Sequence, residues 1–319
     1  AAGHDVAVHD LGAPFAPSID DLGRLLALRA PDLVGVTLFT ESALATYDLL
    51  RPLQGDDRLW VAGGIHATTV PDEPLRYGFH ATVQGEGEAA IVELARLAGA
   101  GLGGRTVLAD VAGIAWRDRD DRLHRNPRRE PLADLDALAS SDAGRRLFPR
   151  EWYTQDPAAS LPASFMTSRG CPGGCTFCSS LVMGRRHRVH SVARVLADLK
   201  AFTAREGAAS WSFHDDAFTA DRDRLIALCR GIEEAFPGPK QWWCESRADH
   251  LDAASAAAMK RAGCTTVVFG VESGDDATLR AIGKGITVAQ VERALAAAQQ
   301  AGLSTCANLM PGLPGETPE

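Results

Sequence analysis

The run SRGCPGGCTFCSS, residues 168–180, decides the fold because it places three cysteines on one short loop rich in Gly and Pro. Cys171, Cys175 and Cys178 follow a C-x3-C-x2-C spacing. Three thiolates so placed can hold three irons of a 4Fe-4S cluster and leave the fourth iron open. A cluster held by four protein thiolates transfers electrons, whereas an open iron can bind and activate a substrate. The spacing therefore predicts chemistry at iron.

A zinc site and a set of unrelated buried thiols are the alternatives for this triplet. Structural zinc sites usually pair their ligands two by two in C-x2-4-C knuckles. The chain has no second knuckle and no close histidine pair. Three cysteines within eight residues are improbable as unrelated core residues. We therefore favour the iron-sulfur cluster.

Phe177, directly before the third cysteine, extends the pattern. With it, the run resembles the signature of the radical S-adenosylmethionine (SAM) enzymes, in which an aromatic residue commonly holds that place. The resemblance implies that SAM binds the open iron through its amino and carboxylate groups. Homolysis of SAM then gives a 5'-deoxyadenosyl radical that abstracts a substrate hydrogen. Phe177 and Ser179 are expected to contact SAM.

Composition is that of an ordinary globular chain. The 319 residues with 45% hydrophobic content suffice for two cores, so two domains are expected. A formal net charge of -8 leaves no broad basic surface for nucleic acid. No apolar stretch is long enough to span a bilayer, and we expect no signal peptide. Seven cysteines, an odd number, favour the reducing cytoplasm over a disulfide framework.

The first domain is expected at residues 1–105, where short apolar strands alternate with amphipathic helices. Such a pattern predicts a parallel sheet covered on both faces, with ligands bound beyond the carboxyl ends of its strands. Because Ala1 is followed almost at once by a strand pattern, we expect the chain to open inside this domain. Strands are predicted at 6–8, 33–39, 59–62 and 81–83, and helices at 18–29, 43–53 and 88–97.

Three polar or Gly-rich segments fall at the carboxyl ends of these strands. Alone they are weak evidence, since a Gly-Gly after a strand is usually a tight turn. Ahead of the cysteine triplet, however, they resemble the cobalamin-binding domain of cobalamin-dependent radical SAM enzymes, in which GG-x-H-A-T and G-E-G-E turns are frequent. The resemblance implies a Rossmann-like domain whose first strand precedes Ala1. It also implies cobalamin beside Thr40, Ser42, Gly63, Gly64, His66, Gly85, Glu86 and Gly87.

Two histidines bear on the cobalt. Cobalamin proteins that ligate the metal from below usually carry D-x-H-x-x-G, but here Ala7 stands where the Asp would be, and only His9 and Gly12 match. We therefore interpret His9 as a surface residue and expect cobalt without a histidine ligand from this motif. His66 stays open between a turn residue and a neighbour of the corrinoid.

Residues 106–160 are expected to form a hairpin and a linker, and residues 161–319 a second alternating pattern. Repeated strand and helix units of this size predict a parallel (β/α) barrel. The patterns predict an α/β fold, and the resemblance implies a Rossmann-like cobalamin-binding domain followed by a partial radical SAM barrel, which we expect to be truncated at both ends. Barrel strands are predicted at 163–167, 210–214, 241–245, 265–269 and 304–309, and helices at 191–205, 221–235, 253–262 and 288–301.

Polar residues follow each of the later barrel strands. Any one of them could be a helix cap or part of a surface salt bridge. Together they match radical SAM positions, and the resemblance implies an acidic turn at the SAM amine, an Arg at its carboxylate, a Glu-Ser at the ribose and the GLPGE run at 312–316 near the adenine. An ammonium needs an acceptor and a carboxylate suits a bidentate Arg. These residues are Asp215, Asp216, Arg247, Glu272, Ser273 and Asn308.

The resemblance implies a cobalamin-dependent radical SAM methyltransferase that acts on an unactivated carbon or phosphorus centre. Its expected cofactors are a 4Fe-4S cluster, SAM and cobalamin. The expected partners are a small-molecule substrate, such as a natural product or a lipid, and a one-electron reductant such as flavodoxin or ferredoxin. One alternative keeps the cofactors but ends in cyclisation, ring rearrangement or oxidation. Another has a first domain that binds no corrinoid and serves as an interaction module.

Overall fold

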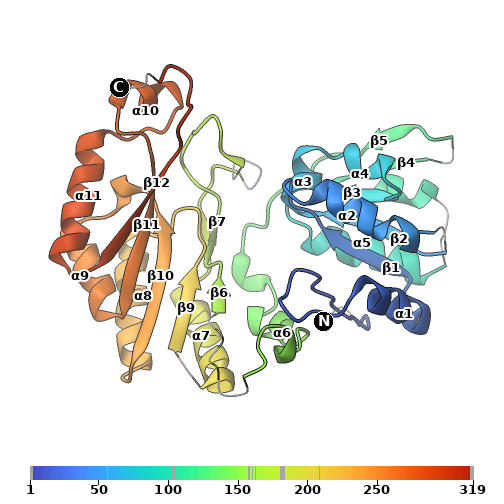
Figure 1. Ribbon diagram of the computed structural model, residues 1–319, viewed down its shortest axis with the longest axis horizontal. Helices are drawn as coiled ribbons and strands as arrows, with labels where there is room; N and C mark the ends of the chain where they lie inside the picture. The colour runs from blue at the N-terminus through green and yellow to red at the C-terminus, as the bar shows by residue number, and fades with distance from the viewer. Residues whose placement is uncertain are drawn as a thin grey trace. The chain divides into compact units, whose positions relative to one another are not determined.

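The computed structural model describes residues 3–55, 57–101, 105–118, 120–156, 159, 161, 163–179, 184–207 and 209–316. The chain divides into two compact units (Figure 1). The first comprises Ala1–Leu132 with Phe148–Thr154, and the second Ala133–Leu147 with Gln155–Glu319. In the described part of the chain, no helix has the length and apolar character needed to cross a membrane.

The first unit is built on one sheet with the strand order β1-β2-β3-β4-β5. β1, β2 and β3 are parallel, as the alternating pattern predicts, and β4 and β5 continue the sheet as an antiparallel hairpin. The predicted hairpin is therefore confirmed, and it belongs to the sheet of the first unit. The strands are β1 (Leu33–Thr37), β2 (Leu59–Gly63), β3 (Ala81–Val83), β4 (Ile114–Arg117) and β5 (Leu123–Arg125).

Two apolar clusters cover the two faces of this sheet. Alternation along β2 sends Trp60 and Ala62 toward α1 and α2, whereas Val61 packs with α5. Ser18 starts α1 with a capping box to Asp21. The helical segments are α1 (Ile19–Arg29), α2 (Ala43–Leu50), η1 (Arg51–Leu53), α3 (Gly64–Thr69), α4 (Glu73–Arg76), α5 (Glu88–Gly99) and η2 (Arg105–Asp110).

The strand predicted at residues 6–8 is wrong. These residues have no regular structure, and β1 at the end of the sheet pairs with β2 alone. An extended segment forms a strand only when a neighbour accepts its backbone hydrogen bonds. No described strand provides one for this segment.

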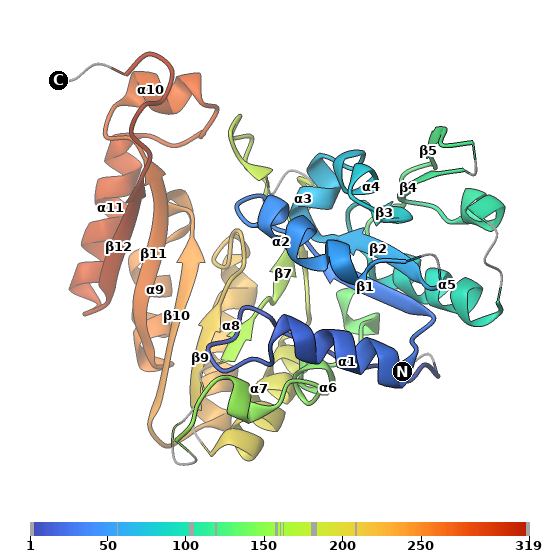
Figure 2. The same ribbon diagram turned by 45° about the vertical axis from the view of Figure 1, so that its right-hand side comes forward.

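The second unit contains a parallel sheet with the order β12-β11-β10-β9-β6. Figure 2 shows β12, β11, β10 and β9 side by side. Neighbours in the sheet are also successive in this order along the chain, which confirms the predicted partial barrel. β12 lies at the edge of the sheet, and all of its residues are exposed. The strands are β6 (Ala163–Phe165), β9 (Ala209–Phe213), β10 (Lys240–Ser246), β11 (Cys264–Glu272) and β12 (Ser304–Leu309).

Four helices pack on one face of this sheet and bury Phe213, Trp242, Cys244, Val267 and Phe269. Ser191, Asp221, Asp252 and Thr287 cap their amino ends. Because side chains alternate along a strand, the opposite, inner face carries Ser164, Ser212, Trp243 and Glu245. The helices are α7 (Val192–Glu206), α8 (Arg222–Ala235), α9 (Ala253–Arg261) and α11 (Val288–Gln300).

Several short elements escape the sequence pattern because each is too brief to show a period. β7 and β8 pair antiparallel and join the two ends of the segment that contains the cysteines. α10 lies between β11 and α11 in the chain. These elements are η3 (Leu135–Ala137), α6 (Ser141–Arg145), η4 (Arg150–Trp152), β7 (Ser168–Arg169), β8 (Arg188–Val189), η6 (Ala248–His250) and α10 (Asp276–Ala281).

Candidate functional site

The three predicted cluster ligands lie on the segment between β7 and β8. Cys175 is buried, and Cys171 and Cys178 are partly exposed. Within the residues that the structure describes, no three His, Cys, Asp or Glu side chains converge as metal ligands would. The role of the three thiols as cluster ligands therefore stays a prediction.

A glycine loop after α10 supports the cysteine segment. Thr176 N–H donates to the carbonyl of Ile282 at 2.9 Å. Gly283 has φ of 66°, and a Cβ there would lie 2.9 Å from the carbonyl oxygen of Gly174. Only glycine fits this approach without a shift of the backbone.

Arg247 links the end of β10 to both loops. Its Nε and Nη2 donate to the Asp249 carboxylate at 3.0 and 3.1 Å, and Nη2 also donates to the Lys284 carbonyl at 3.0 Å. Its Nη1 faces the cysteine segment, because a Cβ on Gly173 would lie 2.7 Å from this nitrogen. Burial raises the pKa of the Cys171 thiol, while the Gly173 N–H and the Arg247 charge oppose that rise.

Glu272 ends β11 in the left-handed region, with φ of 72°. Its carboxylate pairs with the Lys284 ammonium at 2.9 Å, and the two side chains are 11% and 7% exposed. Gly270 leaves room for the pair, since a Cβ there would lie within 3 Å of both charged groups. Sequence reasoning missed Lys284, although the Gly-Lys-Gly run at 283–285 was a visible signal.

The two neighbouring aspartates after β9 have different surroundings. Asp215 is fully buried, and its two carboxylate oxygens accept the backbone N–H and the hydroxyl of Thr167. Asp216 is exposed. Desolvation and the nearby charges of Asp215 and Glu245 raise the pKa of Asp216. Of the two, Asp216 is the one placed to accept a bond from a ligand.

The remaining predicted SAM residues lie on the cysteine segment, directly after β11 and on β12. Phe177 and Ser179 are exposed on the cysteine segment. Ser273 is buried, and its hydroxyl accepts the N–H of Asp275. Asn308 lies on the exposed strand β12, and Glu316 closes the following turn by accepting the N–H groups of 312 and 313.

In the first unit, the predicted cobalamin segments meet at the carboxyl ends of β1, β2 and β3. His66 is 4% exposed. Its Nδ1 lies 3.2 Å from the Thr40 hydroxyl and its Nε2 lies 3.1 Å from a Glu73 carboxylate oxygen. Because both ring nitrogens have partners, His66 ties α3 to α4 and to the segment after β1.

The glycines of these segments differ in the space that surrounds them. A Cβ on Gly64 would lie 2.8 Å from the Leu38 carbonyl, so this glycine is required by the fold itself. At Gly63 and Gly85, a Cβ would meet nothing within 4 Å. Thr68 accepts the Gly85 N–H at 3.0 Å and so fixes one turn to the other.

Three other predicted cobalamin residues serve the local structure. Ser42 precedes α2 and Gly87 precedes α5, each at the N-cap position without a side-chain cap bond. The Glu86 carboxylate accepts the Leu132 N–H at 2.8 Å. These contacts leave their proximity to a corrinoid a prediction.

His9 is less exposed than the sequence suggested. Its ring packs edge-on against Trp152 at 5.6 Å between centroids, and Nε2 is buried with no hydrogen-bond partner among the described residues. His9 is therefore a partly exposed residue whose Nε2 side is covered. The cause is the segment 148–154, which returns to the first unit.

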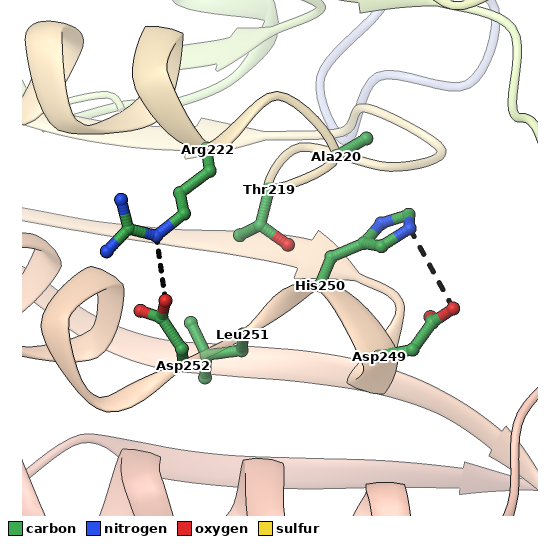
Figure 3. Close-up of a pocket in the computed structure, with 7 residues that line it drawn as sticks. All are labelled: Thr219, Ala220, Arg222, Asp249, His250, Leu251 and Asp252. Atoms are coloured by element: carbon green, nitrogen blue, oxygen red, sulfur yellow. Dashed lines mark hydrogen bonds and ion pairs between the residues drawn. The ribbon is translucent and has the colours of Figure 1, made fainter.

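A polar cavity of about 270 Å³ lies between the starts of α8 and α9 (Figure 3). Part of its lining, residues 249–252, follows Arg247 in the chain. Arg222 donates to Asp252 at 2.7 Å, and His250 lies 3.8 Å from Asp249. Its charged groups are thus paired with one another. The lining residues are Thr219, Ala220, Arg222, Asp249, His250, Leu251 and Asp252.

Two family models match the chain. One, described as the radical SAM superfamily, matches residues 165–319. The other, described as the B12 binding domain, matches residues 1–95.

The chain is similar to curated proteins over nearly its whole length. It is 32% identical to an uncharacterized methyltransferase of Pyrococcus horikoshii, over 99% of this chain and 68% of that protein. It is 27% identical to the anaerobic magnesium-protoporphyrin IX monomethyl ester cyclase of Rubrivivax gelatinosus, over 95% of this chain and 55% of that protein. The chain thus spans roughly half to two thirds of these relatives.

A solved structure shares the fold. The radical S-adenosylmethionine methyltransferase TsrM from Kitasatospora setae, solved with tryptophan substrate and a SAM analogue, superposes with a TM-score of 0.75 at 23% identity. The match covers 94% of this chain and 60% of that chain.

Proposed function

Because the chain belongs to the radical SAM superfamily and carries a B12 binding domain, we propose that it is a cobalamin-dependent radical SAM methyltransferase. The family membership confirms the resemblance drawn from the cysteine run and the glycine turns. It also supports the predicted cofactors, which are a 4Fe-4S cluster, SAM and cobalamin. The proposed reaction is methyl transfer to an unactivated carbon or phosphorus centre of a small molecule.

The observation that carries the proposal is the cysteine loop and the groups around it. Cys171, Cys175 and Cys178 would hold the cluster. Gly173 and Gly283 allow the loop to lie close to its neighbours. A Cβ on Gly173 would collide with Arg247, and a Cβ on Gly283 would collide with the Gly174 carbonyl. Arg247 places one positive charge beside the loop, which suits an anionic cluster or a SAM carboxylate.

The other polar groups at the strand ends would bind SAM. Asp216 would accept from the SAM amine, and the Nη1 group of Arg247 would donate to the SAM carboxylate. Glu272, held by Lys284, would accept from the ribose hydroxyls. Phe177, Ser179, Ser273 and Asn308 complete the proposed contact set. Asp215 would act indirectly, by fixing Thr167 ahead of the cysteine segment.

The open positions at Gly63 and Gly85 fit a large flat ligand at the edge of the first sheet. His66 would position this edge and not ligate cobalt, since both of its nitrogens are engaged. When bound, the cluster supplies the electron that cleaves SAM and cobalamin carries the methyl group. A one-electron reductant such as flavodoxin or ferredoxin and a cytoplasmic location complete the proposal.

A second candidate, cyclisation without methyl transfer, is favoured by the similarity to the Rubrivivax cyclase. Product mass separates the two candidates. A methyltransferase adds one methylene unit to its substrate, whereas cyclisation adds none.

We test the proposal by anaerobic reconstitution of the full-length protein with iron, sulfide and hydroxocobalamin, followed by SAM, reductant and a cell extract from its source. Isotope-labelled methyl from SAM should appear in a small-molecule product. The spectrum should show bound corrinoid. Absence of bound corrinoid would leave the interaction-module alternative, and an unlabelled product would favour the cyclase.

A further inference from the structure

The inner face of the second sheet carries a polar group that the SAM and cluster assignments do not use. His214 Nδ1 lies 3.2 Å from a Glu245 carboxylate oxygen, and its Nε2 lies 3.1 Å from the Ser212 hydroxyl. The Trp243 ring meets the His214 ring edge to face at 4.7 Å. Ser212 in turn contacts the Ser164 hydroxyl at 3.1 Å. The group therefore bridges β6, β9 and β10.

The geometry fixes the orientation of the imidazole. His214 Nδ1 lies within ion-pair distance of the Glu245 carboxylate, which keeps the two side chains side by side. Ser212 and the Trp243 ring hold the imidazole on two further sides. Yet the side chains of His214 and Glu245 are 40% and 46% exposed, so this is no core ion pair.

The charge around this group is negative. Asp216 and Glu245 interact electrostatically, and Asp216 also interacts with Cys171 of the cysteine loop. The two cations at the neighbouring strand ends are already paired, Arg247 with Asp249 and Lys284 with Glu272. An anionic ligand would therefore meet repulsion, whereas a cation would find a carboxylate and the face of an indole.

We propose that Glu245, His214 and Trp243 anchor the substrate of this enzyme through a cationic nitrogen that lies beside an apolar or aromatic carbon frame. Glu245 accepts from the nitrogen, His214 keeps that carboxylate in place, and Trp243 packs on the frame. The anchor rests on the proposed function, because it places the substrate on the inner face of the radical SAM barrel. It narrows the substrate class to amines and related N–H cations.

The test uses the full chain labelled with 5-fluorotryptophan. The six tryptophans give separate fluorine resonances, and Trp243→Phe identifies the one of interest. The probes are benzylammonium, neutral benzyl alcohol and anionic benzoate at millimolar concentration. Benzylammonium should shift the Trp243 resonance saturably and bind roughly tenfold more tightly than benzyl alcohol, with benzoate weakest.

Glu245→Gln keeps the acceptor for His214 and removes the charge, so it should abolish the preference for benzylammonium. Glu292→Gln, on the exposed face of α11, is the matched control and should preserve it. Equal binding of the three probes, or an unchanged preference in Glu245→Gln, would overturn the anchor. The assay needs no cluster, SAM or corrinoid. Failure of the proposed function would appear instead as missing iron or SAM cleavage in the parallel reconstitution.

Discussion

Asp215 and Asp216 are adjacent in sequence, and the sequence pattern assigned both to the SAM amine. Burial separates them. Both carboxylate oxygens of Asp215 accept hydrogen bonds from Thr167, just before the cysteine segment. Asp216 is exposed. Arg224 also donates to the Thr167 carbonyl, at 3.1 Å, so this backbone unit is held from two sides.

Substitution by asparagine should therefore affect stability at Asp215 and SAM binding at Asp216. Asp215→Asn turns one buried acceptor into a donor and should lower the free energy of unfolding by about 1–3 kcal/mol. Asp216→Asn should change stability by less than about 0.5 kcal/mol but weaken SAM binding several-fold. Urea unfolding and SAM titration of the reconstituted variants measure the two quantities. Normal SAM affinity in Asp216→Asn would remove Asp216 from the site.

At the level of elements, the loop 282–285 between α10 and α11 connects the separate parts of the site. Its Ile282 and Gly283 contact the cysteine segment. The Lys284 carbonyl accepts a hydrogen bond from Arg247, and the Lys284 ammonium pairs with Glu272. The cysteine segment, Arg247 and Glu272 thus all depend on one short turn. The turn has to be tight, because Gly283 and Gly285 both have positive φ.

Gly283→Ala should impair cluster retention. The added Cβ would meet the Gly174 carbonyl at 2.9 Å, so the cysteine segment would have to move. Gly207→Ala is the matched control, because Gly207 has φ of 75° but its Cβ would meet nothing within 4 Å. Both variants carry backbone strain of about 1–2 kcal/mol. Iron per chain should fall only in Gly283→Ala; equal iron in both would show that the contact is unimportant.

The long elements could be predicted from the sequence because their periods are strong and their caps are explicit, as at Ser18 and Ser191. The order of the barrel strands followed for the same reason. Side-chain partners could not be predicted. Lys284 lies outside any regular pattern, and the Glu245–His214 pair depends on strand register, which a single sequence does not display.

Over the whole chain, two units of different architecture carry two groups of candidate residues. The first unit presents its glycine turns at the ends of β1, β2 and β3, and the second presents the cysteine loop at the ends of its own parallel strands. Ligand sites at the carboxyl ends of parallel strands are the rule for both architectures. The proposed reaction depends on the cysteine loop, since without a cluster the other candidate residues have no reaction to serve.

Metal content after anaerobic reconstitution tests that claim most directly. Wild-type protein should hold about four irons per chain with the absorption of a 4Fe-4S cluster. Alanine at Cys171, Cys175 and Cys178 together should abolish both signals, whereas alanine at the buried Cys229 should preserve them. One zinc per chain without iron-sulfur absorption, or an intact cluster in the triple variant, would contradict the account.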